Sequence, residues 1–240
     1  MFLCPDCKSR VCLSEDVASK MGFASNLQIS CSNSRCNFEK KFYTSRKQSQ
    51  AFEINRRIVL AAREIGVGHK GLIRFAGLMD MPPPMNKNSY KDIVKSLKSA
   101  AETVANNSMA KAAKETKPFY EEGEDNITDI AVSSDGTWRR RGFKSSSAIV
   151  TAMSLVTGKV LDIEIMSKEC RTCLVNSSKR GKPEFEDWWK AHESECHANF
   201  HGSSGAMDPA GCLAIFSCSV EKHGVQYTEF LGDGDSINNY

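Results

Sequence analysis

The chain has 240 residues, of which 40% are hydrophobic and 25% are charged, a composition typical of globular proteins. It contains no run of about 18 apolar residues, which excludes a transmembrane helix, and its first residues, MFLCPDCKSR, lack the apolar segment of a secretory signal. We therefore expect an intracellular protein, in which the ten cysteines are metal ligands or free thiols rather than a disulfide framework.

The net charge of +3 conceals two halves of opposite sign. Residues 1–119 carry 20 Lys and Arg against 10 Asp and Glu, whereas residues 120–240 carry 12 against 19. A basic half suits a polyanionic partner such as nucleic acid, and an acidic half can hold a divalent cation. Taken alone, this asymmetry is equally compatible with a role in solubility.

Residues 1–45 are rich in cysteine, serine and asparagine, with short β-like runs. Two closely spaced cysteine pairs in this segment are typical of a zinc ribbon, because each pair places two thiolates on one tight turn. We expect a structural Zn²⁺ ion, since a small loop-rich segment cannot bury enough apolar surface alone. Reduced free thiols are the alternative, with Cys12 as a spare thiol. The four predicted ligands are Cys4, Cys7, Cys31 and Cys36.

The next segment, residues 46–120, is predicted to be helical and basic. Apolar residues recur at helical spacing between Phe52 and Ile65, and Gly66 ends that helix. After the breaker Met81–Pro84, a long helix is predicted from Asn88 to about Lys117. The acidic run 121–125 is the expected boundary with the following domain.

After residue 126 the pattern changes to β-strands, giving the order strand, strand, strand, helix, strand that is typical of an α/β fold. Thr157-Gly158 is a hairpin signal between the second and third strands. The predicted strands are 127–134, 149–156, 159–166 and 227–231, and the predicted helix is 209–223.

A polar insert at 167–201 contains a second set of metal-binding residue types. Its Cys-x2-Cys pair is followed by His-x3-Cys on a predicted helix, 183–195, where positions i and i+4 share one face. We expect a second Zn²⁺ site with three cysteines and one histidine. His197 and His201 are rival fourth ligands, and a surface histidine beside unrelated thiols is the alternative. The preferred ligands are Cys170, Cys173, His192 and Cys196.

Three carboxylates follow predicted strands in the acidic half. Asp135 comes at the end of the first strand, and Asp233 and Asp235 come after the last. Carboxylates at the ends of neighbouring strands are well placed to share Mg²⁺, a cation that prefers oxygen ligands and supports phosphoryl transfer. The alternative is a set of ordinary Asp-Gly turns.

Basic residues in two places are candidates for contact with nucleic acid. One group lies near the predicted ribbon and first helix, and the other follows Trp138, where arginine beside an aromatic ring suits phosphate contact and base stacking. Solvated surface positions are the alternative in both places. The candidates are Arg46, Lys47, Arg56, Arg57, Arg139, Arg140 and Arg141.

Taken in order, several motifs resemble those of the Mutator-like transposase domain of animal genomes, and the resemblance covers nearly the whole chain. Each motif alone is weak, but the ordered combination is specific. The motifs are Ser133–Trp138 (SSDGTW), Asn199–Met207 (NFHGSSGAM), Leu231–Ser236 (LGDGDS), Glu53–Arg57 (EINRR), Gly66–His69 (GVGH) and Met81–Pro84 (MPPP).

That family is similar to DDE transposases with a ribonuclease-H-like core, so the resemblance implies Mg²⁺- or Mn²⁺-dependent cleavage and strand transfer of DNA in the nucleus. In such a core the first acidic residue ends the first strand and the second ends the fourth. Asp135 matches the first, and Asp233 matches the second, with Asp235 as a close rival. The segment 167–201 would then be a zinc-binding insertion between the third strand and the helix.

The expected architecture is therefore mixed α/β, with a zinc ribbon at 1–45, a basic helical DNA-binding region at 46–120 and a partial ribonuclease-H-like core at 126–240. The third acidic residue of a DDE triad lies on a later helix, and the sequence ends at Tyr240. We therefore expect a C-terminally truncated fragment without strand-transfer activity of its own.

Two other functional classes are alternatives to the transposase interpretation. One is a host-adopted, non-catalytic zinc-dependent DNA-binding or chromatin protein, and the other is a zinc-dependent scaffold for protein interactions. DNA is the expected partner, together with a possible homo-oligomer, and neither a membrane nor a small-molecule substrate is expected.

Overall fold

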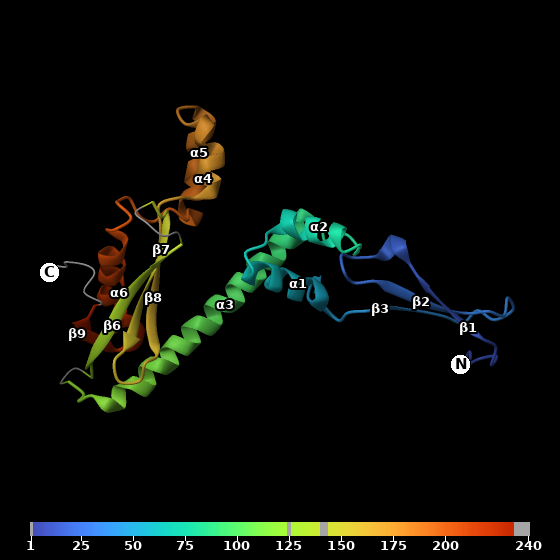
Figure 1. The fold of residues 1–240 in the computed structure, drawn as a ribbon, viewed down its shortest axis with the longest axis horizontal. Coiled ribbons are helices and arrows are strands. Elements are labelled where there is room, and N and C mark those ends of the chain that lie inside the picture. The colour runs from blue at the N-terminus through green and yellow to red at the C-terminus, as the bar shows by residue number, and fades with distance from the viewer. Residues whose placement is uncertain (1, 124–125, 140–143, 233–240) are drawn as a thin grey trace. The chain divides into compact units, whose positions relative to one another are not determined.

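The computed structural model describes residues 2–123, 126–139 and 144–232, and the chain divides into two compact units, Met1–Thr103 and Val104–Tyr240 (Figure 1). Helices and sheets are both present, so the predicted mixed α/β class is confirmed. None of the helices in the described parts of the chain is long and apolar enough to cross a membrane.

The first unit begins with a three-stranded antiparallel sheet in the order β1-β2-β3. Its strands are β1 (Val11–Glu15), β2 (Asn26–Cys31) and β3 (Glu39–Tyr43), with a short 3-10 helix at Val17–Ser19. Among the described residues 2–45, only Cys4, Ala24 and Asn26 are buried. The sheet therefore has almost no apolar core of its own.

The helical part of this unit starts with a small hairpin and continues through two short helices into a long one. The elements are β4 (Lys47–Gln48), β5 (Ala51–Phe52), α1 (Glu53–Glu64), α2 (His69–Leu78) and α3 (Lys87–Thr116). One apolar cluster joins them through Val59 of α1, Leu72 of α2 and Ile93 of α3. The long predicted helix is observed, whereas α2 was not predicted as a separate helix.

The second unit is built around a four-stranded sheet in the order β8-β7-β6-β9, with β9 parallel to β6 and the other pairs antiparallel. Helix α6 precedes β9, so the predicted order of three strands, a helix and a strand is observed. The bounds are β6 (Thr128–Trp138), β7 (Ser147–Ser154), β8 (Val160–Ser167), α6 (Met207–His223) and β9 (Val225–Leu231).

Helix α6 packs closely on one face of this sheet (Figure 1). A Cβ atom on Gly211 would overlap the side chain of Val150, so the glycine permits the close approach of helix and strand. The Oγ atom of Ser134 lies 3.1 Å from the Sγ atom of Cys212. Ile130, Val132, Leu161, Ile215 and Val225 are at most 1% exposed and form the apolar core with these elements.

Between β8 and α6 the chain forms a helical insert, as the sequence predicts. It contains α4 (Arg171–Asn176) and α5 (Pro183–His192), with 3-10 turns at Ser177–Lys179 and Glu193–Glu195. A further 3-10 turn, Lys117–Phe119, follows α3. Within the insert, 168–200, the buried residues are Cys170 and His192.

A buried polar cluster lies at the C-terminal end of α6. Asp162 of β8 is 1% exposed, and its carboxylate oxygens lie 3.1 and 3.2 Å from the Nζ atom of Lys222. The Nε2 atom of His223 is 3.9 Å from the same carboxylate. Burial lowers the pKa of His223; Asp162 acts in the opposite direction, and Lys222 and Lys117 lower the pKa further.

The lowered pKa of His223 predicts a loss of stability on acidification. The unfolded chain takes up a proton near pH 6.5 while the folded histidine stays neutral, so the free energy of unfolding should fall as the pH drops below about 6.5. Urea denaturation followed across this range should show that slope in the wild type and a shallower slope in His223→Asn. The exposed His201→Asn is the control, and an unchanged slope in His223→Asn would contradict the assignment.

Candidate metal centres and nucleic-acid interface

The first cysteine cluster lies at one end of the N-terminal sheet, where β1 and β3 begin and β2 ends. Cys4 and Cys7 precede β1, Cys31 ends β2, and Cys36 precedes β3. The four sulfur atoms lie within 4.8 Å of one another, with Cys4 and Cys36 3.7 Å apart and Cys7 and Cys31 3.4 Å apart. Four sulfurs around a tetrahedral zinc ion at about 2.3 Å would be about 3.8 Å apart. The geometry can therefore hold a metal ion of this kind.

Local backbone turns direct these sulfur atoms toward each other. The amide of Lys8 donates to the carbonyl of Cys4 at 3.0 Å, and the amide of Asn33 donates to the sulfur of Cys31 at 3.4 Å. Hydrogen bonds with Ser9 lower the pKa of Cys7 to about 6, so the thiolate needed for metal ligation forms readily. Cys12 is exposed on β1 and is not part of the cluster.

The second cluster lies in the helical insert. Cys170 precedes α4, Cys173 lies within it, His192 is the last residue of α5, and Cys196 follows the next 3-10 turn. Their ligand atoms lie within 4.8 Å of one another, with 3.3 Å between Cys170 Sγ and His192 Nε2 and 3.5 Å between the sulfurs of Cys173 and Cys196. This arrangement can also hold a metal ion.

Burial separates His192 from its two rivals. His192 is 9% exposed and stacks on Trp188 with ring centroids 4.7 Å apart, whereas His197 and His201 are exposed. Burial alone would raise the pKa of the Cys170 thiol. Hydrogen bonds outweigh this effect and lower the pKa to about 5, and the largest contribution among them comes from the backbone of His197. The prediction of one helix through 195 is wrong, because α5 ends at His192.

Asp135 lies on β6 and is exposed to solvent. The prediction that the strand ends at this residue is wrong, because β6 continues to Trp138 in pairing with β7. On the other side of β6, the parallel pairing with β9 ends at Ser133 and Leu231. Asp135 therefore lies two residues beyond the last pair of this ladder among the described residues.

Several predicted residues fall outside the described parts of the chain. These are Asp233, Asp235, Arg140 and Arg141. Arg139 is described, is exposed, and donates its backbone amide to the carbonyl of Ser147 at 3.1 Å.

Three of the four basic residues predicted near the ribbon line two hollows of the first unit. Arg46 and Arg57 line a shallow hollow of about 440 Å³, and Arg57 forms an ion pair with Glu53. Arg56 lines a larger groove of about 790 Å³, where its Nη1 atom donates to Oε1 of Gln48 at 3.1 Å. The exposed Lys47 lies on β4, next to Arg46 in the chain.

Comparison with protein families decides the identity of the chain. The family model described as Mutator-like transposase matches residues 2–239. The chain belongs to this family. The resemblance carried by the ordered motifs is thereby confirmed. Neither the comparison with curated proteins nor that with solved structures gave a match.

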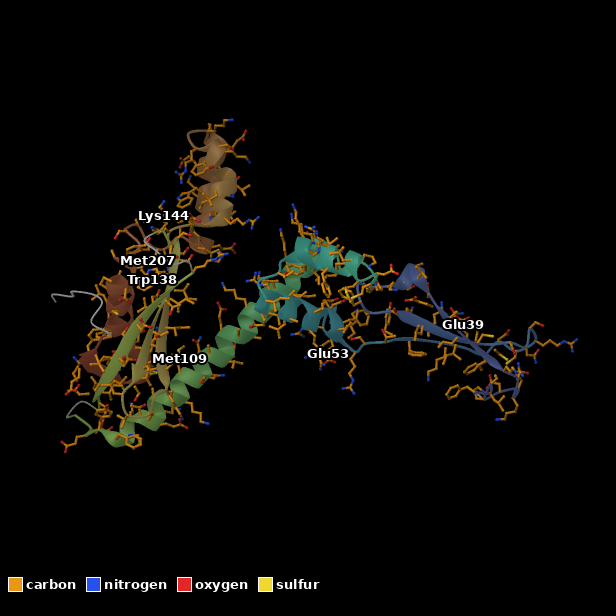
Figure 2. The ribbon with its side chains drawn as sticks, viewed as in Figure 1. Glu39, Glu53, Met109, Trp138, Lys144 and Met207 are labelled. Atoms are coloured by element: carbon orange, nitrogen blue, oxygen red, sulfur yellow. The ribbon has the colours of Figure 1, made fainter. Side chains whose placement is uncertain are left out.

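In this Mutator-like transposase chain, the segment 199–206 is hydrogen-bonded to the ends of the edge strand β8 and the central strand β6. The side chain of Asn199 accepts from the amide of Ser167 at 2.7 Å and donates to the carbonyl of Ile165 at 2.7 Å. The indole of Trp138 donates to the carbonyl of Ser204 at 3.1 Å, and Figure 2 labels Trp138 and Met207 at this end of the sheet. The family motifs around 135 and 199 thus meet in space.

One acidic residue near Asp135 was missed in the sequence. Asp208 lies in the first turn of α6, and a Cβ atom on Gly136 would be 2.7 Å from its Oδ1 atom. Lys168, also unpredicted, donates to the Oγ atom of Ser204 at 3.1 Å. The position of Asp208 three residues after the Gly-Ser-Ser-Gly motif was a signal that could have pointed to it.

Proposed function

We propose that this chain is the zinc-dependent, DNA-binding part of a nuclear Mutator-like DDE transposase and carries the first two acidic residues of its DNA cleavage and strand-transfer centre. Asp135 is the first of these residues and Asp233 the second, with Asp235 as the rival for the second position. The observation that carries the proposal is the position of Asp135 on β6, just beyond the end of the parallel pairing with β9.

The sheet topology supports a ribonuclease-H-like core. Three antiparallel strands are followed by a helix and by a strand that pairs parallel with the first, in the order β8-β7-β6-β9. Ser133 is paired with Leu231, and in the sequence Asp135 and Asp233 each come two residues later. Equal offsets from one residue pair favour Asp233 over Asp235.

The chemistry requires groups that hold a cation and the DNA backbone near each other. When bound, Mg²⁺ or Mn²⁺ would activate the attacking oxygen and stabilise the leaving oxygen in phosphoryl transfer. The exposed carboxylate of Asp135 supplies the hard oxygen ligand that these ions prefer. Arg139 directly follows the end of β6 at Trp138 and is placed to contact a phosphate, and in the sequence Arg140 and Arg141 continue this basic run.

Structural zinc is proposed for both cysteine clusters. The sets Cys4-Cys7-Cys31-Cys36 and Cys170-Cys173-His192-Cys196 have the donor types and separations of tetrahedral zinc sites. Cys4 is one of the three buried residues of the first segment, and Cys170 and His192 are the buried residues of the second. The metal would therefore supply the core that these segments lack.

DNA binding is assigned mainly to the first unit, Met1–Thr103, which carries 17 Lys and Arg against 9 Asp and Glu. Affinity for a random-sequence duplex should fall steeply between about 50 and 200 mM salt, because bound Lys and Arg release counterions from phosphates. Charge reversal at Arg56 and Arg57 should weaken binding by at least about tenfold and make the salt dependence shallower. Fluorescence anisotropy of labelled duplex measures both quantities.

The control for this experiment reverses two other exposed charges of the same unit, Lys95 and Lys98 on α3. Lys98, like Arg57, forms an i,i+4 ion pair with a glutamate, so the local perturbation is matched. Unchanged affinity after Arg56→Glu and Arg57→Glu would remove that pair from the interface. Binding that does not depend on salt would remove phosphate contact as its basis.

A non-catalytic zinc-dependent DNA-binding protein is the second candidate. It is favoured by one observation, namely that both cysteine clusters and the basic unit lie outside the strand that carries Asp135. In that case Asp135→Asn and Asp233→Asn would leave every function of the protein unchanged.

A further inference from the structure

Helices α1 and α2 are joined by a tight four-residue turn, 65–68. Gly66 ends α1 with a φ of +74°, and the amide of Val67 donates back to the carbonyl of Ala62 at 2.6 Å. Gly68 then opens α2 by accepting from the amide of Leu72 at 2.9 Å. Two helices joined by a short glycine-containing turn are the basic unit of helix-turn-helix proteins.

The orientation of α2 is fixed by contacts along one face. Leu72 is 2% exposed and Ala76 is 1% exposed, and Leu72 packs in the cluster shared with α1 and α3. At the start of α2, the Nε2 atom of His69 lies 2.9 Å from the carbonyl oxygen of Met85, and its ring packs against Tyr90 at 5.1 Å. The opposite face of α2 is therefore presented in a defined direction.

The exposed face of α2 is basic and unpaired. Lys70, Ile73, Arg74 and Gly77 follow the i, i+3, i+4, i+7 spacing of one helix face. Lys70 and Arg74 are exposed, and Ile73 is 48% exposed. The sequence of α2, HKGLIRFAGL, contains no acidic residue, and no ion pair of the described residues involves Lys70 or Arg74.

Nothing in the described parts of the chain explains why residue 77 is a glycine. A Cβ atom at this position would have nothing within 4 Å, and its φ does not lie in the left-handed region. Glycine in a helix costs about 1 kcal/mol relative to alanine, so the residue weakens α2 without a conformational or packing reason. A missing side chain on an exposed, basic helix face leaves room for the close approach of a partner.

We propose that Glu53–Leu78 is a DNA-binding helix-turn-helix in which α2 enters the major groove of duplex DNA. Lys70 and Arg74 contact phosphates or guanine edges, Ile73 faces the bases, and Gly77 leaves room for the sugar-phosphate backbone. The major groove, about 12 Å wide, admits an α-helix, and arginine and lysine are the commonest side chains that read guanine there. This inference rests on the DNA binding proposed above and names the element that performs it.

The test uses the zinc-loaded full chain and three variants, Lys70→Ala, Arg74→Ala and Gly77→Gln. Each is expected to lower affinity for duplex DNA by about tenfold or more. The salt slope should decrease by about one for each lost phosphate contact at Lys70 or Arg74 and should stay constant in Gly77→Gln. The melting temperature of Gly77→Gln should be equal to or above that of the wild type, because glutamine favours the helix more than glycine.

Matched controls are Lys95→Ala and Lys98→Ala, which remove exposed charges from α3 of the same unit. Their affinities should equal that of the wild type. Bound protein should also protect guanine N7, a major-groove atom, from methylation by dimethyl sulfate.

The outcomes separate this inference from the proposed function. If the wild type binds duplex DNA and all three variants bind it with the same affinity, the role of α2 is overturned, whereas the proposed DNA binding of the chain is retained. Failure of the wild type to bind any duplex would overturn both. The variants could also keep their DNA affinity but lose self-association in a sedimentation experiment. That result would show that the α2 face binds protein and would contradict the inference.

Discussion

Loss of the first metal ion is expected to unfold residues 2–45 and to leave the rest of the chain folded. In this segment Cys4, Ala24 and Asn26 are the buried residues, so the cysteine cluster takes the place of an apolar core. Binding of structural zinc is worth about 10–16 kcal/mol in small zinc-dependent modules, far more than this sheet can gain from apolar burial. The Cys4→Ser variant should therefore contain one zinc ion fewer per chain and lose the protection of its β2 amides from hydrogen exchange.

The control is Cys12→Ser, which removes an exposed thiol on β1 that lies outside the cluster. Zinc content and amide protection should both be unchanged in this variant. If the β2 amides (Asn26–Cys31) of the wild type stayed protected after complete chelation, the metal would not be the core of this module.

The second large effect is expected at the insert between β8 and α6. His192→Ala should remove one zinc ion per chain and unfold α4 and α5, because Cys170 and His192 are the buried side chains of this segment. Tryptophan fluorescence provides a local measurement, since Trp188 stacks directly on His192. The strands β6 to β9 should remain protected, because their core contains neither ligand.

The controls for the second site are His197→Ala and His201→Ala, both at exposed positions. Each should retain its zinc and the wild-type fluorescence. Loss of zinc in His197→Ala or His201→Ala but not in His192→Ala would identify a different fourth ligand from the one that the structure brings to Cys170.

Regular sequence patterns predicted much of the fold. The apolar spacing between Asn88 and Lys117 predicted α3, which runs from Lys87 to Thr116, and Thr157-Gly158 predicted the turn between β7 and β8. Both signals are local, because helix periodicity and turn chemistry depend on residues that are near each other in the chain. The spacing of cysteines also predicted the two clusters that the structure assembles.

Features that depend on distant contacts could not be predicted in this way. Asp135-Gly136 has the sequence of a turn, yet Gly136 is paired with Val150 and lies under the carboxylate of Asp208, more than 70 residues away in the chain. Helix α2 was missed because its apolar residues lie on several sides of the helix, although only Leu72 and Ala76 are buried in the structure. The apolar residues are Leu72, Ile73, Phe75, Ala76 and Leu78.

His192 was predicted correctly as a member of the second cluster, but for a reason that differs from the one the structure shows. The sequence argument placed His192 and Cys196 on one helix face, but α5 ends at His192 and a 3-10 turn carries the chain to Cys196. The histidine reaches Cys170 because it is buried against Trp188. Spacing therefore named the residue, whereas packing explains its position.

The most direct test of the transposase assignment is Mn²⁺ binding by the zinc-loaded chain, followed by electron paramagnetic resonance of the free ion. We expect one Mn²⁺ site that is lost or weakened at least about tenfold in Asp135→Asn and in Asp233→Asn, since each change removes a charged oxygen ligand. Asp129→Asn, an exposed aspartate on the same strand, should bind Mn²⁺ as the wild type does. Equal Mn²⁺ binding by the wild type and Asp135→Asn would contradict the assignment of β6 as the strand that carries the first catalytic carboxylate.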